Sequence, residues 1–197
     1  QGGVFIWPIL ITSLWAFTML FERLFFFAKE SKRLKKAAET YFRYAQRTSI
    51  TEVQQKVNEK KGLIPEILAA AWDPAHKGVS LAERAVEEVL HKYQPSLDRH
   101  LTTIATIAGL QPLLGLLGTI TGMIATFSVI SSQGTGDAAA LADGISEAMI
   151  TTQAGLCAAV PILLAHNYLR NRFKTLMAQL QGTCARALKE MEHHVAE

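Results

Sequence analysis

The chain has 197 residues, of which 49% are hydrophobic, and its 20 lysines and arginines outnumber its 17 aspartates and glutamates by three. The apolar residues are concentrated in three long uncharged runs. The basic residues lie between and after these runs, so membrane topology accounts for the charge and a nucleic-acid partner is not expected. The two cysteines, Cys157 and Cys184, lie far apart and lack metal-ligand spacing, so we expect both to be packing residues and not a disulfide.

The first predicted element is a transmembrane helix within residues 1–27. Residues 4–21 carry no charge, and these 18 residues approach the roughly 20 that a helix needs to cross the hydrocarbon core. No basic region precedes this run, and no small-residue cleavage site follows it before the sequence FFFAKESKRLKK. We therefore expect a membrane span and not a secretory signal.

Residues 28–100 are predicted to form a cytoplasmic helical region. They hold fourteen of the basic residues against ten acidic ones, and the positive-inside rule places such a segment in the cytoplasm and the N-terminus outside. The sequences KKGLIP and DPAHKG supply breaks between helices. At about 70 residues with few aromatic side chains, this region is expected to be a modest bundle and not an enzyme domain.

Two further transmembrane helices are predicted in the second half of the chain. The uncharged run at residues 101–136 is longer than a bilayer requires, so its helix should extend into the cytoplasm. A third uncharged run covers residues 148–169. The predicted segments are a transmembrane helix at 101–132, a short periplasmic turn at 133–140, a transmembrane helix at 141–169 and a cytoplasmic helical tail at 170–197. The fold class is thus an all-α integral membrane protein with three transmembrane helices and long cytoplasmic extensions.

Small residues follow one side of the second predicted span. Gly115, Gly118 and Gly122 recur at spacings of three and four, with Thr119 and Thr126 among them. Such spacing lets membrane helices approach closely, and by itself it does not distinguish a packing seam from a functional surface. GLLGTITG is not a phosphate-binding loop, because it lacks the lysine and lies within an apolar span.

If the second and third spans fold back on each other, Thr119 and Thr152 reach the same depth near the middle of the membrane. In an oligomer that level would become a ring of hydroxyl groups. Glu147 is the acidic residue nearest this level, about 9 Å of helix inside Leu141. A carboxyl group there faces either a protein interior, as a candidate proton carrier, or the outer water beside Asp143, and position alone leaves both open.

Two motifs together resemble a known family. LQPLLGLLGTITGMIATF at residues 110–127 and DGISEAMITTQAGLCAAVPILLAHN at residues 143–167 closely resemble the ExbB/TolQ/MotA proton-channel family, and its ExbB-like members most of all. The resemblance is strong over roughly residues 110–167, and the predicted topology extends it across the chain.

This resemblance implies a function. Members of this kind form homo-pentamers in the bacterial inner membrane around a central pore that holds the helices of an ExbD-like dimer. Proton flow is the coupling reaction, with no further cofactor and no enzymatic activity. The work reaches outer-membrane receptors through a TonB-like protein and energises import of iron–siderophore complexes or vitamin B12. A TolQ-like motor for envelope constriction, or a passive membrane scaffold, are the alternatives.

The resemblance also implies residue roles. The glutamate of its GISEA motif is Glu147, which the resemblance makes the essential polar group of the proton pathway, near the partner's aspartate. The pore-lining threonines of the same pathway are Thr119 and Thr152, although Thr151 adjoins Thr152 and leaves an ambiguity of one residue. The glycines assigned to helix packing are Gly115, Gly118, Gly122 and Gly155. The titrating aspartate of the family belongs to the partner subunit.

Overall fold

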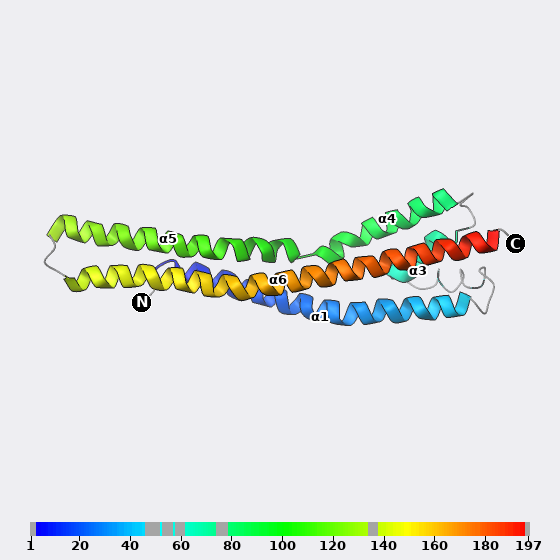
Figure 1. Ribbon diagram of the computed structural model, residues 1–197, viewed down its shortest axis with the longest axis horizontal. Helices are drawn as coiled ribbons and strands as arrows, with labels where there is room; N and C mark the ends of the chain where they lie inside the picture. Colours follow the sequence, from blue (N-terminus) through cyan, green and yellow to red (C-terminus); the bar gives the residue numbers. More distant parts are fainter. Residues whose placement is uncertain are drawn as a thin grey trace. The chain divides into compact units, whose positions relative to one another are not determined.

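The computed structural model describes residues 3–45, 52, 57, 62–73, 79–133 and 138–195 (Figure 1). The longer described segments form helices α1 (Ile6–Ala45), α3 (Leu63–Ala71), α4 (Val79–Asp98), α5 (Leu101–Gln133) and α6 (Ala138–Val195). The chain divides into two compact units, one of Gln1–Leu24 with His100–Arg170 and the other of Phe25–Arg99 with Asn171–Glu197. Helices α1 and α6 contribute residues to both units.

Among the described residues, three helical stretches are long and apolar enough to cross a membrane: Ile6–Tyr44, Val79–Ser132 and Leu141–Met191. They agree with the three spans expected from the sequence. Half of the predicted periplasmic turn at 133–140, namely residues 134–137, lies outside the described residues. Helix α5 has 33 residues and is longer than a bilayer requires. The chain turns between α4 and α5 at His100, whose φ of 69° is left-handed. Two separate helices, α4 and α5, therefore occupy Val79–Gln133.

In the first unit, each helix buries only one narrow stripe. On α6 the stripe recurs at spacings of three and four, as expected for one face of a helix. Its members are Ala148, Thr151, Gly155, Ala159, Ile162, His166 and Leu169. Large apolar side chains such as Trp7, Leu14 and Leu164 remain more than half exposed. Exposure on this scale is normal only where lipid or another protein chain covers the surface.

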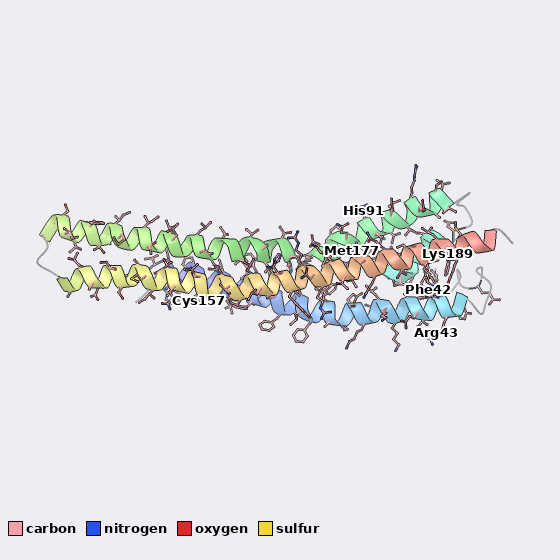
Figure 2. The ribbon with its side chains drawn as sticks, in the orientation of Figure 1. Phe42, Arg43, His91, Cys157, Met177 and Lys189 are labelled. Atoms are coloured by element: carbon pink, nitrogen blue, oxygen red, sulfur yellow. The ribbon has the colours of Figure 1, made fainter. Side chains whose placement is uncertain are left out.

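The second unit has an apolar core of large side chains. Helix α3 buries six of its nine residues, among them Ile67 and Leu68 at 0% exposure. The indole nitrogen of Trp72, directly after α3, donates a hydrogen bond of 3.0 Å to the carbonyl oxygen of Ala187. Beside it, the Arg186 guanidinium lies 4.1 Å from the ring centre of Phe42, which Figure 2 labels.

The two cysteines differ. Cys184 is buried in the second unit, as expected for a packing residue. Cys157, labelled on α6 in Figure 2, is exposed in the single chain and does not pack within it. Cys157 lies two residues after Gly155, a member of the buried stripe of α6. A rotation of about 200° therefore places Cys157 on the opposite face of the helix.

Candidate functional site

The first unit is built on a close seam between the antiparallel helices α5 and α6 (Figure 1). A side chain at Gly155 would place its Cβ 2.6 Å from the carbonyl oxygen of Gln111, and one at Gly122 would lie 2.8 Å from the Cβ of Ala148. Distances below 3.0 Å are not seen for real Cβ atoms, so these glycines allow the two backbones to approach.

The other two glycines assigned to packing also lie in this seam. A Cβ at Gly118 would collide with the side chain of Thr151, and one at Gly115 would lie 3.0 Å from the Cα of Thr152. Because Gly118 contacts Thr151, their chain neighbours Thr119 and Thr152 lie within about 3 Å of the same level along the hairpin.

The three threonines have different surroundings. Thr151 is 1% exposed, and its hydroxyl donates to the backbone oxygen of Glu147 at 2.9 Å. The Thr152 hydroxyl crosses the seam and donates to the carbonyl oxygen of Gly115 at 2.8 Å, while Thr119 donates to Leu116 at 2.6 Å. Thr119 and Thr152 are half-buried. Of the two adjacent threonines, Thr152 is therefore the one that keeps an open side in a single chain.

Thr119 and Gln111 lie on opposite sides of the seam. Thr119 lies four residues after Gly115 and Gln111 lies four residues before it. Around the axis of α5, each is therefore rotated by roughly 40° from Gly115, in opposite directions. On α6, Thr152 is displaced by roughly 40° from Ala148 in one direction and Glu147 by roughly 100° in the other. Since the helices are antiparallel and right-handed, Thr119 and Thr152 share one side of the hairpin.

Helix α1 packs on the other side of the hairpin. A carboxylate oxygen of Glu147 lies against Gly3, where a Cβ would collide with it. The structure therefore places Glu147 on a different side of the hairpin from Thr119 and Thr152, although all three were assigned to one pathway. Glu147 and Asp143 are both exposed in the single chain.

A buried amide joins α1 to α5. Gln111 is 0% exposed, and its Nε2 lies 2.9 Å from the Ser13 hydroxyl and 3.0 Å from the Thr12 hydroxyl. Its Oε1 is buried without a hydrogen-bond partner among the described residues. We did not assign Gln111 a role from the sequence, although it is the only amide within residues 101–132. Across the described ranges, no group of three histidine, cysteine, aspartate or glutamate side chains could hold a metal ion.

Comparison with known proteins gives consistent matches. The MotA/TolQ/ExbB proton channel family matches residues 59–182. The Putative biopolymer transport protein ExbB-like 1 of Synechocystis is 31% identical over 172 residues, which are 86% of this chain and 68% of that protein. The Biopolymer transport protein exbB1 of Vibrio cholerae is 30% identical over 195 residues, 93% of this chain and 82% of that protein. The Tol-Pal system protein TolQ of Haemophilus influenzae is 33% identical over 93 residues, 47% of this chain and 41% of that protein.

Proposed function

Because this chain belongs to the MotA/TolQ/ExbB proton channel family, we propose that it is a non-enzymatic channel and stator subunit driven by the proton gradient. It acts in the bacterial inner membrane as a homo-oligomer, a pentamer as in ExbB-like proteins. An ExbD-like subunit occupies its central pore, and a TonB-like protein carries the work to outer-membrane receptors that import iron–siderophore complexes or vitamin B12.

The observation that carries this proposal is the uncovered side of the α5–α6 hairpin. Thr119 and Thr152 lie there at one level, each with an open side. Apolar residues displaced in the same direction are exposed, and they are Leu116, Met123, Met149 and Leu156. An exposed apolar face that carries two hydroxyl groups suits the wall of a lumen that encloses a partner's transmembrane helices.

In this proposal Glu147 and the hydroxyl groups have separate tasks. Glu147 is the ionisable side chain of this chain that takes part in proton transfer, since ionisable groups within spans mark proton pathways. Thr119 and Thr152 line the route beside the partner's helices. The coupling ion is the proton, and no metal or organic cofactor is required.

The test is proton flux in liposomes that contain the complex with its ExbD-like partner. We expect Glu147→Ala to lower the flux at least about a hundredfold, the low end of what a positioned proton-transferring group contributes. Asp143→Asn, one turn earlier and also exposed, is the matched control and should conduct normally. Normal flux through an assembled Glu147→Ala complex would contradict the assignment. A passive scaffold would conduct neither with nor without the partner.

A TolQ-like role is the second candidate, because TolQ proteins of two bacteria are 33% and 31% identical over about half of this chain. A deletion strain separates the two roles. Loss of growth on chelated iron is expected for the ExbB-like function, and sensitivity to detergent for the TolQ-like function.

A further inference from the structure

A long groove runs beside α1 within the second unit, and its volume is about 1120 Å³. One wall consists of residues 26–44 of α1, which is roughly 27 Å of helix. The start of α3 and the residues Tyr93, Ser96 and Leu97 of α4 form the rest of the lining. Sites for small ligands usually enclose about 300–1,000 Å³. A groove of this length and volume therefore suits a helix better than a small molecule.

The α1 wall of this groove is basic. Arg33, Lys36 and Arg43 line it, and all three are exposed. Glu30 is the one acidic residue among the described lining residues, and its carboxylate lies 3.7 Å from the Arg33 guanidinium. Within the described ranges, no acidic side chain is at ion-pair distance from Lys36 or Arg43. An occupant that complements the groove therefore carries negative charge.

Helix α4 presents an acidic face, which consists of Glu83, Glu87 and Leu90. Their spacing of i, i+4 and i+7 places the three on one side of the helix, the pattern by which helices dock in grooves. Both glutamates are exposed, and no described basic side chain is at ion-pair distance from either. They are rotated by roughly 80° and 120° from Tyr93 about α4, and neither lines the groove of its own chain.

Each copy thus carries a basic groove and an acidic helix face on different sides of one unit. Two different surfaces that complement each other make a heterologous contact, which generates a ring when the rotation between identical copies closes. We propose that the groove beside α1 binds the acidic face of α4 from a second copy of this chain. The proposal rests on the proposed function only in that the chain forms a homo-oligomer.

The charged pairs of this contact are Lys36 and Arg43 with Glu83 and Glu87. The two cations are seven residues apart, roughly 10 Å along α1, and the two carboxylates are four residues apart, roughly 6 Å along α4. Lysine and arginine side chains are long and flexible enough to cover this difference. Leu90 supplies an apolar group to the same contact.

Cover of the groove is tested by maleimide labelling of the purified complex in a background of Cys157→Ala and Cys184→Ala. Thr40 lines the groove and Glu39 does not, although both are exposed in the single chain. In the complex, we expect the thiol of a Thr40→Cys variant to react at least about tenfold more slowly than that of a Glu39→Cys variant. After dissociation into single copies the two rates should be similar. Similar rates in the complex, or equal protection in single copies, would overturn the proposal.

Charge exchange identifies what covers the groove. Lys36→Glu with Arg43→Glu should raise the labelling rate at position 40 to that at position 39, because like charges would then face each other across the contact. Adding Glu83→Lys and Glu87→Lys should restore slow labelling. Glu88→Lys in place of Glu87→Lys is the control, since Glu88 is also exposed but lies roughly 100° further round α4.

Recovery that is equal with the control, or absent with both, would mean that a lipid or another acidic molecule occupies the groove, and the proposal fails. The labelling does not depend on proton flux. A complex that shows protection and its recovery without conducting contradicts the proposed function and leaves this contact standing. A complex that conducts while position 40 reacts as fast as position 39 contradicts the contact alone.

Discussion

The two units of this chain hold their helices together by opposite means. In the first unit, α5 and α6 meet through Gly118, Gly122 and Gly155, with hydroxyl groups across the contact. In the second, α3 buries large side chains such as Ile67 and Leu68. Apolar burial stabilises a fold only against water, so within lipid close packing and hydrogen bonds must do that work.

This difference in packing predicts which kind of substitution each unit tolerates. A seam of backbone contacts has no space for an added methyl group, whereas a core of large side chains loses most when atoms are removed. The four substitutions below test this contrast, in order of decreasing expected effect.

Leu68→Ala in the second unit should give the largest loss. The side chain is 0% exposed, and truncation of a buried leucine costs about 2–5 kcal/mol through lost burial and the cavity left behind. Trp72 follows α3 directly and is 3% exposed, so its fluorescence in a W7F/W15F background reports unfolding of this unit. Leu81→Ala, at a side chain that is 46% exposed, should change stability little. Similar losses at the two positions would remove the contrast.

Gly155→Ala in the first unit should cost about 1–3 kcal/mol although it adds only one methyl group. The new Cβ would meet the carbonyl oxygen of Gln111 at 2.6 Å, and backbone cannot rotate away as a side chain can. Thermal unfolding of the purified complex measures the effect. Gly182→Ala, where nothing lies within 4 Å, is the matched helix position in the second unit and should be neutral or stabilising. A stabilising effect at Gly155 would show that the seam is looser than described.

Trp72→Phe should cost about 0.5–1.5 kcal/mol, the usual net contribution of one hydrogen bond. It removes the bond from the indole nitrogen to Ala187 while most of the buried ring area remains. Chemical denaturation followed by circular dichroism measures it. A loss as large as that of Leu68→Ala would mean that this bond, and not apolar burial, dominates the second unit.

The smallest effect on stability is expected from protonation of Glu66 at low pH. Hydrogen bonds from Lys92 at 2.7 Å and Tyr93 at 2.5 Å lower the pKa of Glu66 in the second unit. A lowered pKa in the folded state contributes stability above the unfolded value of about 4.3, which is lost as the pH falls through the folded value. Glu66→Gln should therefore flatten the dependence of unfolding on pH below about 5. An unchanged profile would show that the pair is too solvated to matter.

The sequence was sufficient for features that depend on local composition. Three spans followed from uncharged runs, and the spacing of Gly115, Gly118 and Gly122 predicted a close-packed surface on one helix. The level shared by Thr119 and Thr152 followed from the hairpin alone, because equal helical rise on both sides fixes depth.

Features that depend on α1 could not be predicted in this way. The contacts of Gln111 with Ser13 and of Glu147 with Gly3 join residues that are 98 and 144 positions apart, and no periodicity specifies such docking. The choice between Thr151 and Thr152 depends on a helix rotation of roughly 100°, which spacing within one helix does not determine. The break at His100 carries neither of the usual signals, glycine or proline.

The direction of the threonine hydroxyl groups has a consequence for any water that reaches them. Thr119 and Thr152 both donate their only hydrogen to backbone carbonyl oxygens. Each oxygen can then act only as an acceptor. A neighbouring water must point one of its hydrogens at each, so the two residues orient solvent dipoles at their level, whereas an alanine in either place would leave the solvent free to turn.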